Sequence, residues 1–250
     1  MQGKLFLIGC GPGDSDLLTL KALKVIKQLD VALIDHLLTE EIIALIPSHI
    51  EVIYVGKEKG KHSFPQETIN TMIGHHARQG KIVGRLKCGD PYIFGRGSEE
   101  ALYAATQEIP TEVISGISSA LAAPAAVGIA PTARGVSTGV SIVSAHLAGD
   151  RVNLSWIPLL ALPHHTTVVL MGVSRARQIT SAALQAGISP TLPVAIVANA
   201  TSPQQTHSIT TLESLPALAK IADKPSLLVF GESVKLGDVL PHYNYVAKEL

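Results

Sequence analysis

The chain of 250 residues carries 20 Lys and Arg against 20 Asp and Glu, so its formal net charge is zero. Because 46% of the residues are hydrophobic and only 16% are charged, the chain can bury a large core, which excludes an intrinsically disordered protein. The balanced charge also argues against a general nucleic-acid-binding protein, since such proteins normally carry a basic excess.

Short apolar runs alternate with amphipathic segments through the first half of the chain. These patterns predict buried strands at 5–8, 31–34, 52–55 and 82–86, with helices between them at 17–29, 40–46 and 66–79. Pro65 stands where the first turn of a helix tolerates proline, and Gly80 ends the same helix. Strands that alternate with helices indicate βαβ units and a mainly parallel sheet.

A second series of apolar runs follows a turn-rich segment at 128–135, which we interpret as a domain boundary. This series predicts strands at 140–143, 167–171, 194–197 and 227–230, and helices near 175–185 and 212–221. We therefore expect an α/β protein of two domains, 1–132 and 136–250, with a cleft between them.

The sequence shows neither a membrane-spanning segment nor a metal-binding motif. The most apolar long window, 117–131, is interrupted by two serines and a proline, so no transmembrane helix is predicted. The N-terminal residues run into a strand without the basic start and apolar core of a signal peptide, and a cytoplasmic protein is expected. Cys10, Cys88 and ten scattered histidines form no Cys/His cluster, so we expect no metal site.

The first loop, Gly9-Cys10-Gly11-Pro12-Gly13-Asp14, is rich in glycine and connects a strand to a helix. A dinucleotide-binding loop requires glycine at the sixth position, where this chain has Asp14. Pro12 removes a backbone N–H from the loop, and the Asp14 carboxylate would repel a phosphate. A tight turn with a capping Asp14 explains that residue alone, but not the three glycines and the proline.

From this loop onwards the sequence resembles the tetrapyrrole methylases. The matching motifs follow the family's order over nearly the whole chain, at 9–14, 17–23, 34–38, 54–57, 60–70, 85–100, 116–120, 131–134, 171–172, 201–205 and 229–232. The resemblance implies the two-domain α/β fold of a class III methyltransferase and a homodimer. It also implies that S-adenosylmethionine binds in the cleft between the domains, with catalytic and substrate loops in the first domain and the cofactor site completed by the second.

The resemblance further implies the reaction. Two methyl groups pass from S-adenosylmethionine to C2 and C7 of uroporphyrinogen III, giving S-adenosylhomocysteine and precorrin-2 for sirohaem and cobalamin biosynthesis. The block at 56–66 favours this early substrate, although a later precorrin stays open. A weakly catalytic sensor of S-adenosylmethionine or tetrapyrrole is a further alternative. The only partner expected besides a second copy is a small tetrapyrrole, with no nucleic acid and no membrane.

Five residues match family positions that act in catalysis or substrate binding. By resemblance, Asp35 is the candidate proton acceptor and Lys57 the candidate donor, each at the end of a predicted strand. Open α/β sheets bind ligands at the carboxyl ends of their strands. From position alone, Asp35 could equally cap a helix and Lys57 could be solvated. Arg96 and Arg134 match substrate positions, with Glu99 close after Arg96, and arginine suits a substrate with eight carboxylates.

The resemblance also assigns the cofactor-binding residues, which are Pro12, Cys88, Gly89, Asp90, Ile93, Ser118, Ser119, Met171 and Ala200. Several positions depart from the family's pattern, namely Cys88, Ser118, Ser119 and Ala200 on the cofactor side and His36 and Ala133 on the substrate side. A glycine in place of Cys88 could serve a positive φ or a close ligand approach, both of which a Cβ opposes. The effect of these departures on activity stays open at this point.

Overall fold

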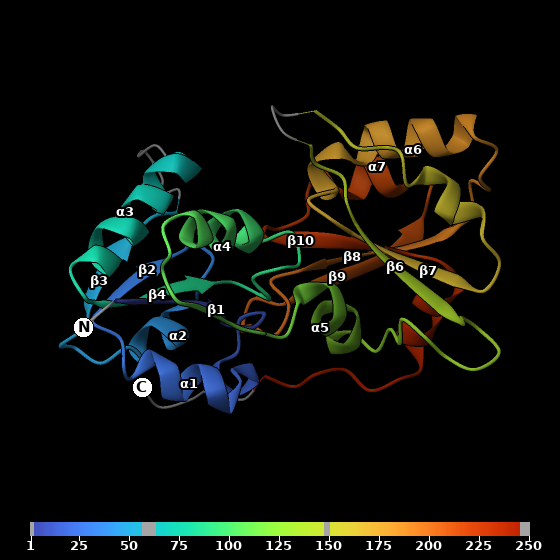
Figure 1. The fold of residues 1–250 in the computed structure, drawn as a ribbon. Coiled ribbons are helices and arrows are strands. Elements are labelled where there is room, and N and C mark those ends of the chain that lie inside the picture. Colours follow the sequence, from blue (N-terminus) through green and yellow to red (C-terminus); the bar gives the residue numbers. More distant parts are fainter. Residues whose placement is uncertain (1–2, 57–63, 148–150, 246–250) are drawn as a thin grey trace. The chain divides into compact units, whose positions relative to one another are not determined.

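The computed structural model describes residues 3–56, 64–147 and 151–245. Contacts divide the chain into two compact units, which meet in the sequence between Ser118 and Ser119. Each unit contains a five-stranded sheet with helices on both faces (Figure 1). The predicted two-domain α/β class is therefore confirmed.

The sheet of the first unit is entirely parallel and has the strand order β3-β2-β4-β1-β5. Its strands are β1 (Lys4–Gly9), β2 (Val31–Ile34), β3 (Glu51–Tyr54), β4 (Ile82–Lys87) and β5 (Thr111–Ile114). Helices α1 (Leu20–Ile26) and α2 (Glu40–Ala44) pack on one face, and α3 (Gln66–Arg78) and α4 (Gly97–Thr106) pack on the other. Because all strands run the same way, the loops after β1, β2 and β4 share one edge.

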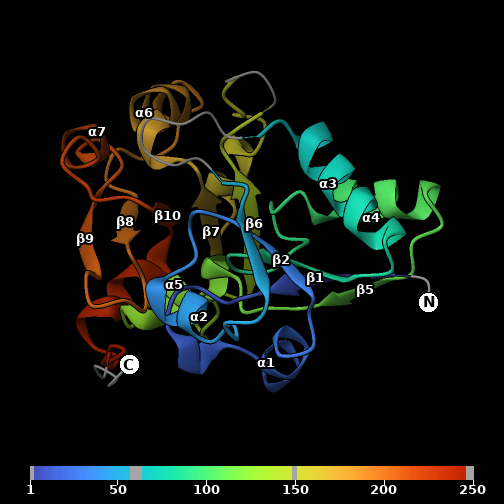
Figure 2. The ribbon, with the colours of Figure 1, turned by 90° about the vertical axis from the view of Figure 1, so that its left-hand side faces the viewer.

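The second sheet is mixed and has the order β6-β7-β10-β8-β9 (Figure 2). Its strands are β6 (Gly139–Ser144), β7 (His165–Leu170), β8 (Pro193–Ala198), β9 (Thr206–Thr211) and β10 (Ser226–Phe230). Only β6 and β7 pair in parallel. Helix α5 (Ser119–Ala126) covers one face, and α6 (Ala176–Gln185) and α7 (Leu215–Leu218) cover the other.

The predicted strands are confirmed, and the helices agree except at their ends. The first helix begins at Leu20 rather than at Leu17, because the Thr19 hydroxyl caps it by accepting a hydrogen bond from Ala22 N, and residues 15–17 form a short 3₁₀ turn. Helix α7 is far shorter than the predicted 212–221. The structure adds α4, β5, α5 and β9, which the sequence patterns did not indicate.

The division by contacts falls earlier than the turn-rich segment at 128–135 that we interpreted as the boundary. The physical reason is helix α5, whose Ala120 and Ala123 pack against Val168 and Val229 of the second sheet. The helix therefore belongs to the second core, although the sequence analysis placed it within the domain 1–132.

No helix in the three described ranges is both long enough and apolar enough to span a membrane. Within the same ranges, no three His, Cys, Asp or Glu side chains group as a metal site would require.

Candidate functional site

Three loops meet at the carboxyl edge of the first sheet and contact one another through backbone atoms. Gly11 N donates to Gly89 O over 3.2 Å, and Gly89 N donates to Gly11 O over 2.7 Å. A Cβ on Gly9 would lie 2.4 Å from Gly116 N, and a Cβ on Gly116 would lie 2.2 Å from Gly89 O. Only glycine permits this approach, and Gly11 and Gly89 also adopt positive φ of 76° and 70°. We call these four glycines the glycine cradle.

Cys88 fits the cradle without backbone strain, because the positive φ of this loop falls on Gly89 and not on Cys88. The Cys88 Sγ lies 3.6 Å from Gly11 O, to which it donates. Burial, aided by the nearby Asp35 carboxylate, raises the pKa of the Cys88 thiol to about 11. The departure from the family's glycine therefore places a protonated, half-buried thiol beside the cradle.

The Asp90 carboxylate binds backbone N–H groups on two loops. Its Oδ1 accepts a hydrogen bond from Tyr92 N over 2.8 Å, and its Oδ2 accepts one from Gly116 N over 3.1 Å. Pro12 is half-buried in the first loop, and Ile93 is 38% exposed in the loop after Asp90. The structure thus brings Pro12, Cys88, Gly89 and Asp90 to one edge, where backbone and small side chains could hold a ligand.

Asp35 follows β2 at the same edge, with 26% of its side chain exposed. Its Oδ1 accepts a hydrogen bond from Arg85 Nη2 over 2.5 Å. Thr39, and not Asp35, stands at the N-terminus of α2, so the helix-cap interpretation of Asp35 is wrong. The other proposed acid–base residue, Lys57, lies outside the described residues.

Three buried residues beneath Asp35, namely Arg85, Lys87 and Glu100, were not among the predicted site residues. Arg85 Nε donates to Glu100 Oε1 over 2.8 Å, and Lys87 Nζ lies 3.1 Å from Glu100 Oε2. Burial and the neighbouring Arg85 lower the pKa of Lys87. Burial acts to lower the pKa of Arg85 as well, but Asp35 and Glu100 outweigh it and the pKa is raised. The sequence signal that could have indicated this cluster is the presence of two cations, Arg85 and Lys87, in an otherwise apolar strand.

Arg96 and Glu99 form an exposed pair at the start of α4. Arg96 adopts a left-handed conformation with φ of 58°, directly before the helix. Its Nε and Nη2 donate to Glu99 Oε1 and Oε2 over 2.8 and 2.7 Å. The hydrogen bond from Arg96 lowers the pKa of Glu99. Because the two side chains are 57% and 50% exposed, a competing carboxylate can reach this guanidinium.

In the second unit, Met171 and Ala200 lie at one edge of the sheet. Met171 follows β7, is 45% exposed and has a φ of 57°, and Ala200 follows β8. Strand β10 pairs with both β7 and β8. The last residues of these two strands, Leu170 and Ala198, therefore lie opposite successive residues at the start of β10. A hollow of about 370 Å³ lies here, lined by His146, Met171, Val173, Ser174, Arg175, Lys224, Pro225 and Ser226.

Ser118 is buried in the loop after β5, two positions beyond Gly116 of the glycine cradle. Ser119 is half-buried at the start of α5, in the second unit. Arg134 is exposed in a turn closed by the hydrogen bond from Ser137 N to Ala133 O, before β6 begins. This turn adjoins the end of the sheet where β6 and β7 begin, so the second unit by itself does not bring Arg134 to Met171.

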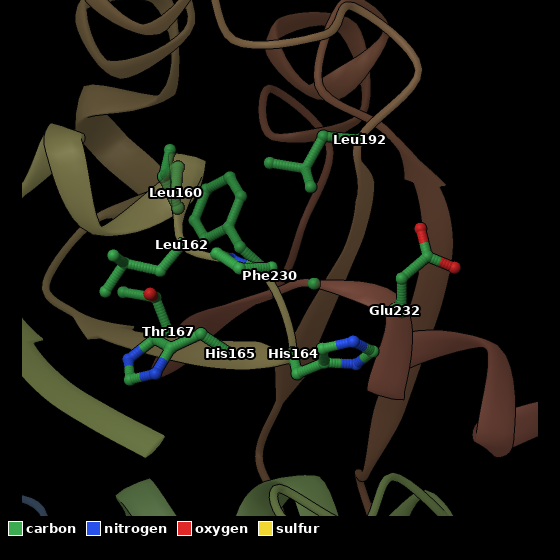
Figure 3. Close-up of a pocket in the computed structure, with 10 residues that line it drawn as sticks. Leu160, Leu162, His164, His165, Thr167, Leu192, Phe230 and Glu232 are labelled. Carbon is green, nitrogen blue, oxygen red and sulfur yellow. The ribbon is translucent and has the colours of Figure 1, made fainter. Parts of the chain in front are cut away.

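A separate cavity of about 110 Å³ also lies at the start of β7 and the end of β10 (Figure 3). Its lining consists of Leu160, Leu162, Pro163, His164, His165, Thr167, Leu192, Phe230, Gly231 and Glu232. None of the predicted site residues lines it, and we do not assign the candidate site there.

Comparisons with known proteins place the whole chain rather than its individual site residues. Residues 4–216 match the family described as Tetrapyrrole (Corrin/Porphyrin) Methylases. The chain is 42% identical over 241 residues to the uroporphyrinogen-III C-methyltransferase of Methanocaldococcus jannaschii, which covers 95% of this chain and 99% of that protein. It is 43% identical over 231 residues to the siroheme synthase of Zymomonas mobilis, covering 92% of this chain but 49% of that enzyme. The chain thus spans about half the length of this second relative.

A solved structure has the same fold. The uroporphyrin-III C-methyl transferase from Thermus thermophilus, complexed with S-adenyl homocysteine, superposes with a TM-score of 0.81 at 36% identity. The match covers 94% of each chain.

Proposed function

Because the chain belongs to the tetrapyrrole (corrin/porphyrin) methylases, we propose that it methylates uroporphyrinogen III at C2 and C7 with S-adenosylmethionine, giving precorrin-2. The observation that carries the proposal is the similarity to the archaeal C-methyltransferase, which extends over 99% of that protein. The product would feed sirohaem and cobalamin-type biosynthesis. The proposal stops at methyl transfer, since the chain spans about half of the siroheme synthase it matches.

The residues at the edge of the first sheet fit S-adenosylmethionine. The cradle of Gly9, Gly11, Gly89 and Gly116 lets three loops approach closely and leaves backbone rather than long side chains at this edge, because a Cβ on Gly9 or Gly116 would meet backbone atoms of a neighbouring loop. We propose that the cofactor-binding residues are Pro12, Cys88, Gly89, Asp90, Ile93, Ser118, Ser119, Met171 and Ala200. When bound, S-adenosylmethionine supplies a methyl group that its sulfonium makes electrophilic, and the bonding electron pair returns to sulfur.

The protein's own task is to orient the macrocycle and to remove a proton from it. A ring carbon that forms its new bond to the methyl group gives the ring system one additional positive charge, and the ring system loses that charge by releasing one proton. We assign Asp35 as the acceptor of that proton. Its Oδ1 is engaged by Arg85, which leaves Oδ2 as the atom that takes the proton. Lys57 is the proposed donor.

Arginines receive the substrate carboxylates in this proposal. Arg96 already holds one carboxylate, that of Glu99, in the bidentate geometry that a propionate or acetate group would use. A substrate carboxylate would displace Glu99 from the guanidinium. Arg134 is the second receptor, and its exposed position leaves its fork accessible.

One experiment tests the function directly. The protein is incubated without oxygen with uroporphyrinogen III and S-adenosylmethionine, and the tetrapyrrole is analysed by mass spectrometry. A mass gain of two methyl groups is expected. The Asp35→Asn variant serves as the control, and its rate of methylation is expected to be lower than that of the wild type. Binding of S-adenosylhomocysteine without any methylation would instead indicate a sensor, and methylation of a later precorrin alone would indicate the other alternative.

The proposal includes a cytoplasmic homodimer, which the family resemblance supports. Light scattering coupled to size-exclusion chromatography measures the mass in solution. A mass of one chain, 26.3 kDa, would contradict the dimer.

A further inference from the structure

A chain of ion pairs lies beneath the carboxyl edge of the first sheet and ends at Asp35. It runs from Lys87 through Glu100 and Arg85 to Asp35, and the closest contact between neighbours is 3.1, 2.8 and 2.5 Å. The side chains of Lys87, Arg85 and Glu100 are exposed by only 3%, 3% and 0%. Asp35, with 26% of its side chain exposed, is therefore the one of these four ion-paired residues that reaches the surface.

The topology explains why these four residues meet. Arg85 and Lys87 are two positions apart on β4, so they point to the same face of the sheet, the face covered by α3 and α4. Glu100 lies on the first turns of α4, and Asp35 follows β2, the neighbour of β4. Helix α3 adds Gln66, whose Nε2 donates to Glu100 Oε1 over 3.2 Å.

The Arg85 guanidinium is fixed on every side. Besides Glu100 and Asp35, it donates from Nη1 to Leu33 O over 3.3 Å and to Leu86 O over 3.1 Å. A planar fork with this many acceptors cannot rotate without losing several buried hydrogen bonds. The oxygen that it holds on Asp35 is therefore held in one place.

Stability alone does not account for such a cluster. The two cations and two carboxylates balance in charge, but apolar side chains of similar volume usually stabilise a core as well or better. What apolar side chains cannot do is hold a carboxylate at the edge of a sheet in a defined orientation. The cluster connects the buried interior to a single exposed carboxylate, Asp35.

We propose that Arg85 and Glu100 are positioning residues for Asp35. Glu100 fixes the guanidinium of Arg85, and Arg85 holds Asp35 Oδ1, so that Oδ2 faces the reacting macrocycle. The inference rests on the proposed function, in which Asp35 accepts the proton released after methylation. Neither Arg85 nor Glu100 touches the reactants in this arrangement, and both act through Asp35.

Arg85→Lys is the central variant, because lysine keeps the positive charge but lacks the rigid fork whose Nε and Nη2 hold Glu100 and Asp35 in fixed places. The expected result is a fall in kcat of at least about tenfold with S-adenosylhomocysteine affinity within about twofold of the wild-type value. Glu100→Gln keeps the shape of the side chain and removes its charge, and it is expected to lower kcat less than Arg85→Lys does. Wild-type kcat in Arg85→Lys would overturn the inference.

Two further measurements separate positioning from simple destabilisation. Thr166→Val removes a buried hydrogen-bond chain in the other unit, in which the Thr166 hydroxyl contacts Ser137 and Ser233 over 2.9 and 2.7 Å. This control is expected to lower Tm and leave kcat unchanged. In an Asp35→Asn background, Arg85→Lys is expected to have no further effect on kcat, because the two residues act as one unit. Additive losses would contradict the inference.

The inference can fail separately from the proposed function. If the wild-type protein does not methylate uroporphyrinogen III, the proposed function fails and the crystal structure of Arg85→Lys decides the inference. A displaced Asp35 carboxylate in that structure supports positioning by Arg85. An Asp35 carboxylate in its wild-type place overturns it.

Discussion

Asp90 and Gly116 are joined by a hydrogen bond from the Gly116 N–H to Asp90 Oδ2, which ties the loop after β4 to the loop after β5. The other carboxylate oxygen accepts from Tyr92 N. The residue that the family resemblance assigns to the cofactor thus also holds the glycine cradle together. Removing the Asp90 carboxylate is therefore expected to loosen the contact between the two loops and to weaken ligand binding.

Asp90→Ala is expected to weaken S-adenosylhomocysteine binding by roughly ten- to hundredfold, since a hydrogen bond to a charged group contributes about 1.5–3 kcal/mol. Tm should fall as well, because two backbone donors lose their acceptor. Asp90→Asn keeps one acceptor oxygen, so its affinity and Tm should lie between those of the wild type and Asp90→Ala. Titration calorimetry and melting curves measure both effects, and unchanged affinity in Asp90→Ala would remove the residue from the cofactor site.

Arg96→Lys is expected to raise KM for the tetrapyrrole by roughly ten- to hundredfold, because the bidentate fork is lost while the charge remains. Tm should hardly change, since an exposed ion pair contributes about 0–1 kcal/mol. The matched control is Lys235→Met, which removes another exposed pair, with Glu232, at the same three-residue spacing. Equal KM values in the two variants would mean that Arg96 does not bind substrate.

Arg134→Lys and Arg134→Ala are expected to lower kcat/KM by about tenfold to hundredfold without changing cofactor affinity. The side chain is exposed and forms no ion pair with the residues that the structure describes, so Tm should stay near that of the wild type. Arg177→Lys, an exposed arginine on α6, serves as the control. Near-normal turnover together with a lowered Tm would make Arg134 a structural residue.

Glu112 on β5 makes the stability of the first unit depend on pH. Lys21 and Lys4 contact its two carboxylate oxygens over 2.5 and 2.8 Å, and these hydrogen bonds lower its pKa from about 4.5 to about 2. Because the pKa of Glu112 is lower in the folded than in the unfolded protein, its ion pairs stabilise the fold at pH values above the unfolded pKa. That contribution is lost as pH falls from about 4.5 towards 2.

The Tm difference between the wild type and Glu112→Gln should therefore be largest near neutral pH and shrink below pH 4.5. Added salt should reduce it as well, because the groups are exposed to solvent. Melting curves across pH and salt check both trends. A difference that is constant with pH would contradict the ion-pair interpretation.

Strands with apolar interiors could be predicted from the sequence, but elements held by their neighbours could not. The run Leu5–Ile8 is apolar on both faces, as a central parallel strand requires. The edge strand β9 reads Thr-His-Ser-Ile-Thr-Thr and has three exposed and three half-buried residues, so its pattern does not differ from that of a loop. Helix α5 consists mostly of small residues and contains Pro124, so it shows no amphipathic period.

Several residues of the candidate site could be proposed from the sequence, but the contacts between them could not. The glycines of the first loop and Asp35 could be identified from the chain, largely through the family resemblance. The pairing of Arg85 with Asp35 and Glu100 joins residues 50 and 15 positions apart, and no local pattern encodes that distance. The same holds for the hydrogen bond between Asp90 and Gly116, which depends on how β1 brings its neighbouring strands together.

The raised pKa of Cys88 and its contact with Gly11 O make this thiol an intrinsic reporter of ligand binding at the glycine cradle. With a pKa of about 11, only about one thiol in ten thousand is ionised at pH 7, so alkylating reagents react slowly while the loops stay joined. The other cysteine, Cys10, is fully buried, and burial raises its pKa further. Alkylation is therefore expected to be slow and confined to Cys88, and a ligand that binds at the glycine cradle should slow it further without any engineered label.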